Sequence, residues 1–428
     1  MLGTSGRNYA NRIWEIPTSG PLVTWVLMQS PYTPDEIDII DVDSHYSPHP
    51  TFWQDHAPTA FKNRVPRICE DEAGLPEWRV DDKPFDSIGF NMIRPDGSKA
   101  QGNMRALPQF DDMHAGSYDV RARVDWLNEH GIHQQIMYPN IGGFSSQMFY
   151  TKIADPELRN VCIRTYNDAA SALQAESGGR LVPLSQLPWW DIDAAEKELE
   201  RTVSELGLLA GPTMFCAPEM HGMPSFNQPE WSRFLSRCEE YEVPLSFHIG
   251  VPGGGAQKPW LESNLDVTTQ LTKGRGMHLA IYTCNSFLSN SWLIANLIFS
   301  GTFMRHPRLK VVSGESGISW LPFFLEAMDF QWHENVESQD KREMWNDMPP
   351  SDVYRQNMFG SFWFEKTALA ENIDFLGADT VMFETDFPHG TSLTDRMTKD
   401  VAATLSTLSP DVRRKVLHDT AARVYNLK

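Results

Sequence analysis

The sequence predicts an α/β fold, namely a (β/α)8 TIM barrel built as one large domain. Short apolar runs typical of buried strands alternate with amphipathic helical patterns from residue 37 to the C-terminus. Acidic and imidazole residues stand at the carboxyl ends of several of these strands, where barrels of this kind carry their active sites. No Gly-x-Gly-x-x-Gly motif follows the first strand, so an open dinucleotide-binding sheet fits the pattern less well.

The first predicted strand contains the run Ile-Ile-Asp-Val-Asp-Ser-His at residues 39–45. Apolar Ile40 and Val42 alternate with Asp41, Asp43 and His45, which predicts that the three polar side chains share one face. A solvated edge strand alternates in the same way, so this run alone does not establish a functional site.

The other elements follow in regular order. Strands are expected at 132–139, 181–187, 211–215, 243–250, 309–315, 357–364 and 380–386. Helices are expected at 119–129, 156–175, 191–206, 227–241, 292–299, 320–332 and 366–375, with two more closing the chain. Gly131, Gly178 and Gly207 end three of these helices, because glycine readily adopts the conformation that terminates a helix.

An N-terminal arm and three long connections interrupt the barrel pattern. Residues 1–36 contain four prolines and no sustained periodicity, which predicts an extended arm preceding a single domain at 37–428. Insertions are expected after strands one, five and six, at 46–118, 251–290 and 334–352. Connections of this length usually cover an active site or form a subunit contact, so a homo-oligomer is expected.

Composition restricts the class of partner. A formal charge of −19 over 428 residues argues against binding to nucleic acid or to an anionic membrane. No apolar run is long enough to span a bilayer, and the N-terminus lacks the pattern of a signal peptide. We therefore expect a cytoplasmic enzyme that acts on a small molecule and uses no nucleotide cofactor.

Five polar residues occupy carboxyl ends of the predicted strands. They are Asp43 and His45 on strand one, His248 on strand five, Glu315 on strand six and Asp386 on strand eight. Each alone could be a hydrogen-bonded core residue or a helix cap. Together at a barrel mouth they would repel one another or stay unsatisfied unless a cation neutralised them, so the sequence predicts a metal site.

The motifs around these residues resemble the amidohydrolase superfamily, in particular its branch of aminocarboxymuconate-semialdehyde and aromatic-acid decarboxylases. The matching stretches are 40–45, 247–248, 299–301, 305–310, 315–322 and 384–389. The resemblance implies metal ligation by the strand-one pair, His248 and Asp386. Two positions depart from it: Asp43 replaces the first histidine of the His-x-His pair, and Glu315 replaces the histidine that polarises the substrate. No lysine on 211–215 is present to form a carbamylated bridge between two zinc ions.

These departures change the expected metal. A set of two histidines and three carboxylates is harder than a histidine-rich set and favours iron or manganese over zinc. The set resembles that of the nonheme di-iron monooxygenases of the same fold, of the platensimycin-pathway and 2-aminoisobutyrate hydroxylase type. This resemblance implies that the five residues bind two iron (or manganese) ions. O2 would then be used to hydroxylate an unactivated C–H bond of a small carboxylic or apolar substrate, and we favour this hypothesis.

Two other functions stay open. A single zinc or manganese ion could support non-oxidative decarboxylation or hydrolysis of a carboxylic acid, with Glu315 or His389 transferring the proton. The chain could instead be a catalytically weak partner subunit of a hetero-oligomer, in which the metal stabilises the fold. His221 and Trp320 are further candidates for the wall of the substrate pocket.

Overall fold

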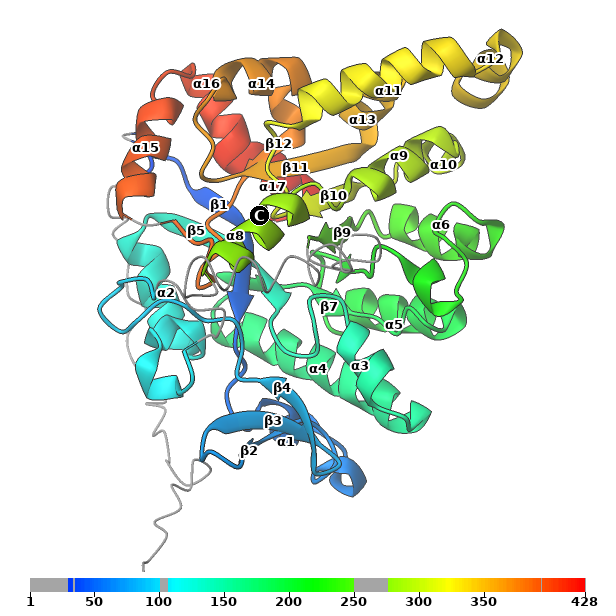
Figure 1. The fold of residues 1–428 in the computed structure, drawn as a ribbon. Coiled ribbons are helices and arrows are strands. Elements are labelled where there is room, and N and C mark those ends of the chain that lie inside the picture. Colours follow the sequence, from blue (N-terminus) through cyan, green and yellow to red (C-terminus); the bar gives the residue numbers. More distant parts are fainter. Residues whose placement is uncertain (1–29, 34, 101–106, 250–275, 394, 428) are drawn as a thin grey trace, which may run out of the picture.

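The computed structural model describes residues 30–33, 35–100, 107–249, 276–393 and 395–427. Its centre is a parallel sheet in the order β6-β5-β1-β12-β11-β10-β9-β8-β7, surrounded by helices (Figure 1). The strands are β1 (Ile39–Tyr46), β5 (Ile132–Pro139), β6 (Leu181–Pro183), β7 (Ser185–Gln186), β8 (Pro212–Thr213), β9 (Leu245–His248), β10 (Val311–Gly314), β11 (Met358–Phe362) and β12 (Val381–Phe383).

The two ends of this strand order belong to one interrupted strand. Only Leu184 separates β6 from β7, so the third predicted strand pairs with β5 through its first half and with β8 through its second. The sheet is therefore closed into eight strands, and the predicted (β/α)8 barrel is confirmed.

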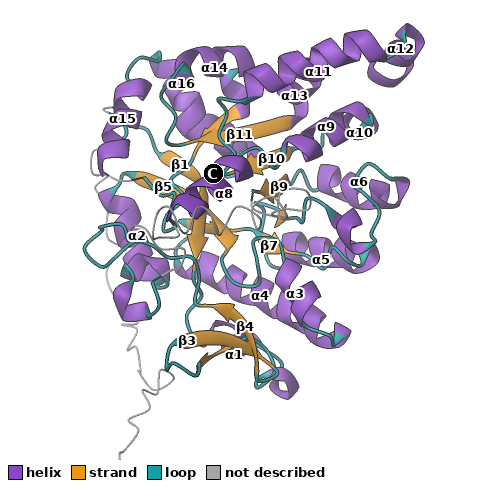
Figure 2. Ribbon diagram, viewed as in Figure 1, coloured by secondary structure: helices purple, strands orange, loops and turns teal. Residues whose placement is uncertain are grey.

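Most of the helices lie around the outside of the sheet (Figure 2). In chain order they are α2 (Val120–Glu129), α3 (Gln147–Lys152), α4 (Pro156–Glu176), α5 (Ile192–Ser204), α6 (Ser232–Glu240), α8 (Gly276–Ser286), α9 (Ser291–Phe299), α10 (Thr302–Arg305), α11 (Leu321–Asn335), α14 (Leu369–Leu376), α15 (Asp395–Leu405), α16 (Pro410–Arg414) and α17 (Thr420–Val424). The side chains of Asp119, Asp155 and Asp191 cap α2, α4 and α5 by accepting hydrogen bonds from backbone N–H groups of the first turn.

The first insertion contains secondary structure that its irregular composition did not predict. It holds the short helix α1 (Phe52–His56) and a three-stranded antiparallel sheet of β2 (Arg67–Glu70), β3 (Pro76–Val80) and β4 (Lys83–Ser87). Trp53 and Trp78 are fully buried and lie edge to face at 5.1 Å, in a separate apolar core shared with α3 and α4. Aromatic burial therefore holds this insertion against the barrel.

The segment expected as a polar excursion after strand six is helical. It forms α12 (Ser338–Trp345) and α13 (Pro350–Asn357). Trp345 is buried and its Nε1–H donates to the carbonyl oxygen of Ile298 at 3.1 Å, which attaches α12 to the barrel helices. The polar residues of α12 lie on its exposed side, so the sequence pattern was interpreted wrongly here.

Two predicted features lie outside the described residues: most of the N-terminal arm, and residues 251–275 of the second insertion. Among the residues that the structure describes, no helix is long and apolar enough to cross a membrane.

Candidate metal centre

Strand β1 presents Asp43 and His45 to the centre but holds Asp41 elsewhere. Its register with β5 shifts directly after Asp41, where β1 contains one more residue than β5, a β-bulge. The Asp41 carboxylate accepts hydrogen bonds from Gln135 Nε2 at 2.7 Å and from the backbone N–H of Thr385 at 3.0 Å. The expected alternation is thus interrupted, and Asp41 is a hydrogen-bonded structural carboxylate.

Two imidazoles and the carboxylate of Asp43 meet in the barrel. Nε2 of His45 and Nε2 of His248 are 3.2 Å apart, and each lies 3.4 Å from an Asp43 oxygen. Nδ1 of His248 is 2.8 Å from the carbonyl oxygen of Ile249, so Nδ1 carries the proton and the Nε2 lone pair faces the cluster. Both Asp43 oxygens are buried without a hydrogen-bond partner.

Glu315 and Asp386 complete the cluster from the ends of β10 and β12. Glu315 Oε2 lies 3.3 Å from His248 Nε2, and Asp386 Oδ1 lies 3.5 Å from His45 Nε2. The Thr391 hydroxyl contacts both carboxylates, at 2.8 Å from Glu315 Oε1. Both acids adopt left-handed backbone conformations, with φ of 51° and 54°, which turn their side chains back over the strand ends.

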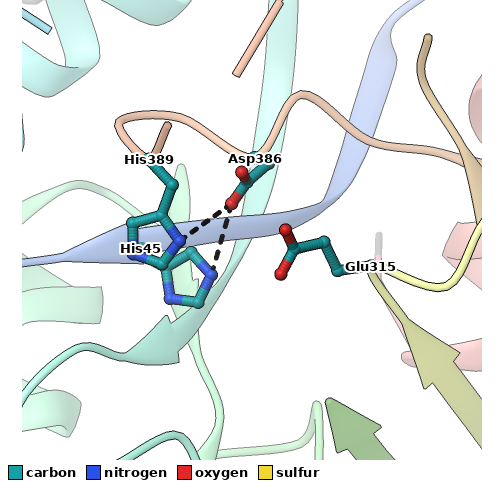
Figure 3. A group of neighbouring side chains, drawn as sticks. All are labelled: His45, Glu315, Asp386 and His389. Atoms are coloured by element: carbon teal, nitrogen blue, oxygen red, sulfur yellow. Dashed lines mark ion pairs between the residues drawn. The ribbon is translucent and has the colours of Figure 1, made fainter. Parts of the chain in front are cut away.

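His389 stands beside this cluster (Figure 3). Its ring stacks on His45 at 3.6 Å, and its Nδ1 lies 3.1 Å from Asp386 Oδ1. Nε2 is 3.0 Å from Asn140 Oδ1, an acceptor, so Nε2 carries the proton and Nδ1 presents a lone pair to Asp386. Asp386 Oδ1 has no hydrogen-bond partner, so two acceptor atoms face each other there.

Burial controls the charge of the cluster. It raises the pKa of Glu315 and of Asp386 to about 7, and together with repulsion from Asp386 it raises the pKa of Asp43 well above its usual value. Burial also lowers the pKa of His45 strongly and that of His389 to about 3, so both imidazoles are neutral. Neutral imidazoles beside buried carboxylates are the protonation states that a divalent cation requires.

The donor atoms fit a metal ion. Among the described residues, one group combines His45, Glu315, Asp386 and His389, and another combines Asp43, His45 and His248, with ligand atoms within 4.8 Å of one another in each. The two groups share His45 and form one continuous site. All five predicted ligands therefore meet at one place, and their mixed nitrogen and oxygen set suits a hard divalent cation such as manganese.

Sequence reasoning missed two residues that border the centre. Glu384 is fully buried, accepts a hydrogen bond from the Ser361 hydroxyl, and leaves Oε1 without a partner. It precedes Asp386 by two residues in the same motif, so its position in the motif was the available signal. The Phe144 ring lies 4.3 Å from His248 and 4.9 Å from His45, and its loop carried no sequence signal.

The two candidates for substrate contact occupy different surroundings. The His221 ring contacts Tyr150, Trp189 and Phe215, at 5.3 to 5.6 Å between ring centroids. Trp320 precedes α11, and its Nε1–H donates to the carbonyl oxygen of Ser316 at 3.0 Å, one residue beyond Glu315. A substrate contact by either residue stays a prediction.

The raised carboxyl pKa values predict how the metal-free protein responds to pH. Glu315 and Asp386 bind their protons more tightly in the folded chain than in the unfolded chain, so their contribution to stability falls as pH rises from about 4 to about 7. With EDTA, the Tm of the wild type is expected to fall relative to that of the variant Glu315→Gln/Asp386→Asn over this range. With Mn²⁺ the stabilisation should increase with pH, because the ion displaces those protons. A pH-independent difference between wild type and variant in EDTA would contradict the assigned pKa directions.

The barrel and the cluster at its strand ends define a metal-binding α/β-barrel protein. Residues 139–427 match the family described as Amidohydrolase. A gamma-resorcylate decarboxylase of Rhodococcus jostii is 26% identical over 300 residues, covering 65% of this chain and 80% of the relative. The chain belongs to the amidohydrolase superfamily, in the aminocarboxymuconate-semialdehyde decarboxylase-like branch.

Solved structures show the same barrel. An amidohydrolase of Mycobacterium avium subsp. paratuberculosis has a TM-score of 0.67 at 20% identity, over 91% of this chain and 99% of that chain. A 5-carboxyvanillate decarboxylase of Novosphingobium aromaticivorans, complexed with manganese and 4-hydroxy-3-methoxy-5-nitrobenzoic acid, has a TM-score of 0.62 at 14% identity, over 94% of this chain and 100% of that chain.

The expectation of a di-iron monooxygenase that consumes O2 is wrong. Curated relatives covering more than three fifths of the chain are decarboxylases, which are lyases and not oxidoreductases. The physical reason for the error is that the reaction was inferred from the chemical hardness of the ligand set alone. A carboxylate-rich set accepts manganese as well as iron, so it constrains the ion without selecting oxygen chemistry.

Proposed function

We propose that this protein is a manganese-dependent, non-oxidative decarboxylase of a small aromatic carboxylic acid. The observation that carries the proposal is the buried cluster in which ligand atoms of Asp43 and Asp386 face neutral imidazoles without hydrogen-bond partners. The decarboxylase relatives and the manganese in a decarboxylase of the same fold support this choice of reaction and ion.

Four residues would hold the ion: Asp43, His45, His248 and Asp386. A divalent cation bound there supplies Lewis-acid attraction for the carboxylate of the substrate. The hydrogen bond of His248 to the carbonyl oxygen of Ile249 and the stacking of His389 on His45 hold the imidazoles in orientation. His389 then orients Asp386 and is a poor proton donor, because burial lowers its pKa to about 3.

Glu315 is the proton donor in this proposal. It is 7% exposed, whereas Asp43, His45 and Asp386 are fully buried, so Glu315 faces the accessible side of the cluster. Burial raises its pKa to about 7, which keeps a proton available near neutral pH. The bond between the ring carbon and the carboxylate breaks and CO2 leaves. The electron pair stays on that carbon and takes the proton from the Glu315 carboxyl, which solvent then restores.

The reaction is tested by incubating manganese-loaded protein with 2,6-dihydroxybenzoate and other hydroxybenzoates under argon and under air. We expect CO2 and the corresponding phenol in equal amounts, at the same rate in both gases. A product that forms only in air, or the absence of product from every hydroxybenzoate, would overturn the proposal.

The number of ions per chain is a separate measurement. Elemental mass spectrometry of the loaded and desalted protein is expected to give one manganese per chain. Two per chain would replace the single ion by a dinuclear centre, in which Glu315 would be a ligand and not the proton donor.

Glu315→Gln separates proton donation from metal binding. The amide keeps the shape of the side chain but cannot supply the proton, so kcat is expected to fall by about 10²- to 10⁴-fold while the manganese content is unchanged. Glu326→Gln, on the exposed side of α11, is the matched control and should leave both quantities unchanged. Wild-type kcat in Glu315→Gln would remove Glu315 from the mechanism.

A further inference from the structure

A cavity of about 730 Å³ lies behind the segment that carries Asp386 and His389. Thr385, Phe387 and Leu393 line this cavity, whereas Asp386 and His389 contact the metal-binding cluster. The segment is therefore a partition between the cavity and the centre. The volume is in the range of small-molecule pockets, and the proposed decarboxylation makes no use of it.

One wall of the cavity carries two hydrogen-bond donors. These donors belong to Lys99 and His114, which both lie next to Ile93. Ile93 forms an antiparallel bridge with Lys99, and the carbonyl oxygen of Ile93 accepts a hydrogen bond from the backbone N–H of His114. The Lys99 ammonium uses one of its three donors on the carbonyl oxygen of Ser392, at 2.7 Å. Nδ1 of His114 accepts from the backbone N–H of Gly116, which leaves the proton of the neutral ring on Nε2.

Another part of the lining is aromatic. Trp126 stacks on Phe387 with ring centroids 4.1 Å apart and on His130 at the same separation. Trp126 and Phe387 are buried, so this wall is a fixed apolar surface. The acidic residues of the lining, Asp96 and Glu129, are exposed and therefore lie at the rim of the cavity. Lys99 is partly buried and carries the positive charge of the lining.

We propose that this cavity is a second ligand site, which binds a small planar organic carboxylate. The ammonium of Lys99 and the imidazole N–H of His114 would bind the carboxylate. The edges of the Trp126 and Phe387 rings would contact the planar body, because their faces are stacked on His130, on each other and on Arg123. None of the four proposed metal ligands lines the cavity, so this proposal does not rest on the proposed reaction.

A ligand in this cavity would contact the chain that holds the metal. Lys99 binds the Ser392 carbonyl, and the Ser392 hydroxyl donates to the carbonyl oxygen of Asp386 at 2.6 Å. Phe387 follows Asp386 directly in the sequence. An occupant that touches Lys99 and Phe387 would therefore be connected to the backbone of Asp386 by two routes.

The test uses 4-fluorobenzoate as the probe and metal-free protein in EDTA, so that binding at the metal centre is removed. Fluorine NMR titration is expected to show saturable binding of one probe per chain. Lys99→Met should raise the dissociation constant by at least about tenfold, because it removes a charge-assisted hydrogen bond, and Lys99→Arg should restore most of the affinity. Lys62→Met, at an exposed lysine remote from the lining residues, is the matched control and should bind as the wild type does.

A second variant leaves Lys99 in place. Leu393→Trp adds volume at the cavity wall and should weaken binding by a comparable factor while Lys99 keeps its contact with Ser392. The proposal is overturned if the metal-free wild type shows no saturable binding, or if binding survives both Lys99→Met and Leu393→Trp unchanged. Neither result depends on decarboxylase activity.

Discussion

Asp43→Asn is expected to raise the thermal stability of the metal-free protein and, at the same time, to abolish metal retention. Burial raises the pKa of this carboxyl well above its ordinary value, and neither oxygen has a hydrogen-bond partner. Asparagine needs neither a buried negative charge nor an added proton at this position, so Tm in EDTA near neutral pH should rise by several degrees. Loss of a residue that only supports a metal ligand typically lowers metal affinity by about 10- to 100-fold. Asp43→Asn should lower the manganese affinity by more than that.

Glu198→Gln provides the control for Asp43→Asn. This carboxylate is also buried but pairs with Arg201 at 2.6 Å on the outer side of the barrel. Its loss should lower Tm and leave the metal content unchanged. Calorimetry in EDTA and elemental analysis after desalting check both variants. A metal-replete Asp43→Asn protein would show that Asp43 is not a ligand, and a variant less stable than the wild type in EDTA would contradict the raised pKa of the Asp43 carboxyl.

Arg123→Lys is expected to weaken manganese binding by about 10- to 100-fold. Arg123 is completely buried on α2 and donates to the carbonyl oxygen of His45, to Gln135 Oε1 at 2.7 Å and to the carbonyl oxygen of Gly116 at 2.5 Å. Its guanidinium also lies 4.6 Å from the centroid of the Phe387 ring. One side chain thus contacts both segments that carry proposed metal ligands, and a lysine cannot reproduce this fork of donors.

The matched control for Arg123→Lys is Arg201→Lys. Arg201 is nearly buried and is held by Glu198 and Asp168, away from the centre. Both variants should lose stability, whereas only Arg123→Lys should lose metal affinity, measured by competition with a chelating dye. Equal losses of affinity in the two variants would show that Arg123 contributes to general stability alone and does not position the ligands.

The sequence predicted the barrel because its strands are short apolar runs and its helices carry recognisable caps and stops. Local signals of this kind act within a few residues, as the capping aspartates Asp119, Asp155 and Asp191 show. The first insertion and α12 could not be read in this way. They are stabilised by distant partners, such as Trp345 bonded to Ile298, and tertiary contacts of this kind leave no local periodicity.

The centre was predicted to a similar extent. Parallel strands bring their carboxyl ends together, and the structure places all five candidate residues in one cluster, while metal ligation by them stays a prediction. The bulge that turns Asp41 away from the cluster arises from the pairing of β1 with β5. The sequence of β1 alone does not encode this pairing. Arg123 was missed for a related reason: its acceptors, such as the carbonyl oxygen of His45, are distant in sequence, so no local pattern identifies the contact.

The left-handed backbone of Glu315 and Asp386 affects how this protein can be engineered. Glycine adopts such a conformation more readily, by about 1 kcal/mol, so either residue could be replaced by glycine with a gain in backbone energy. Burial of the two carboxyl groups adds a second cost to the folded state in the absence of the ion, because it raises their pKa values. A screen that selects variants by heat resistance alone, without manganese, would therefore favour loss of these two acids, and improved thermostability would accompany an inactive centre. Selection in the presence of the ion reverses that preference.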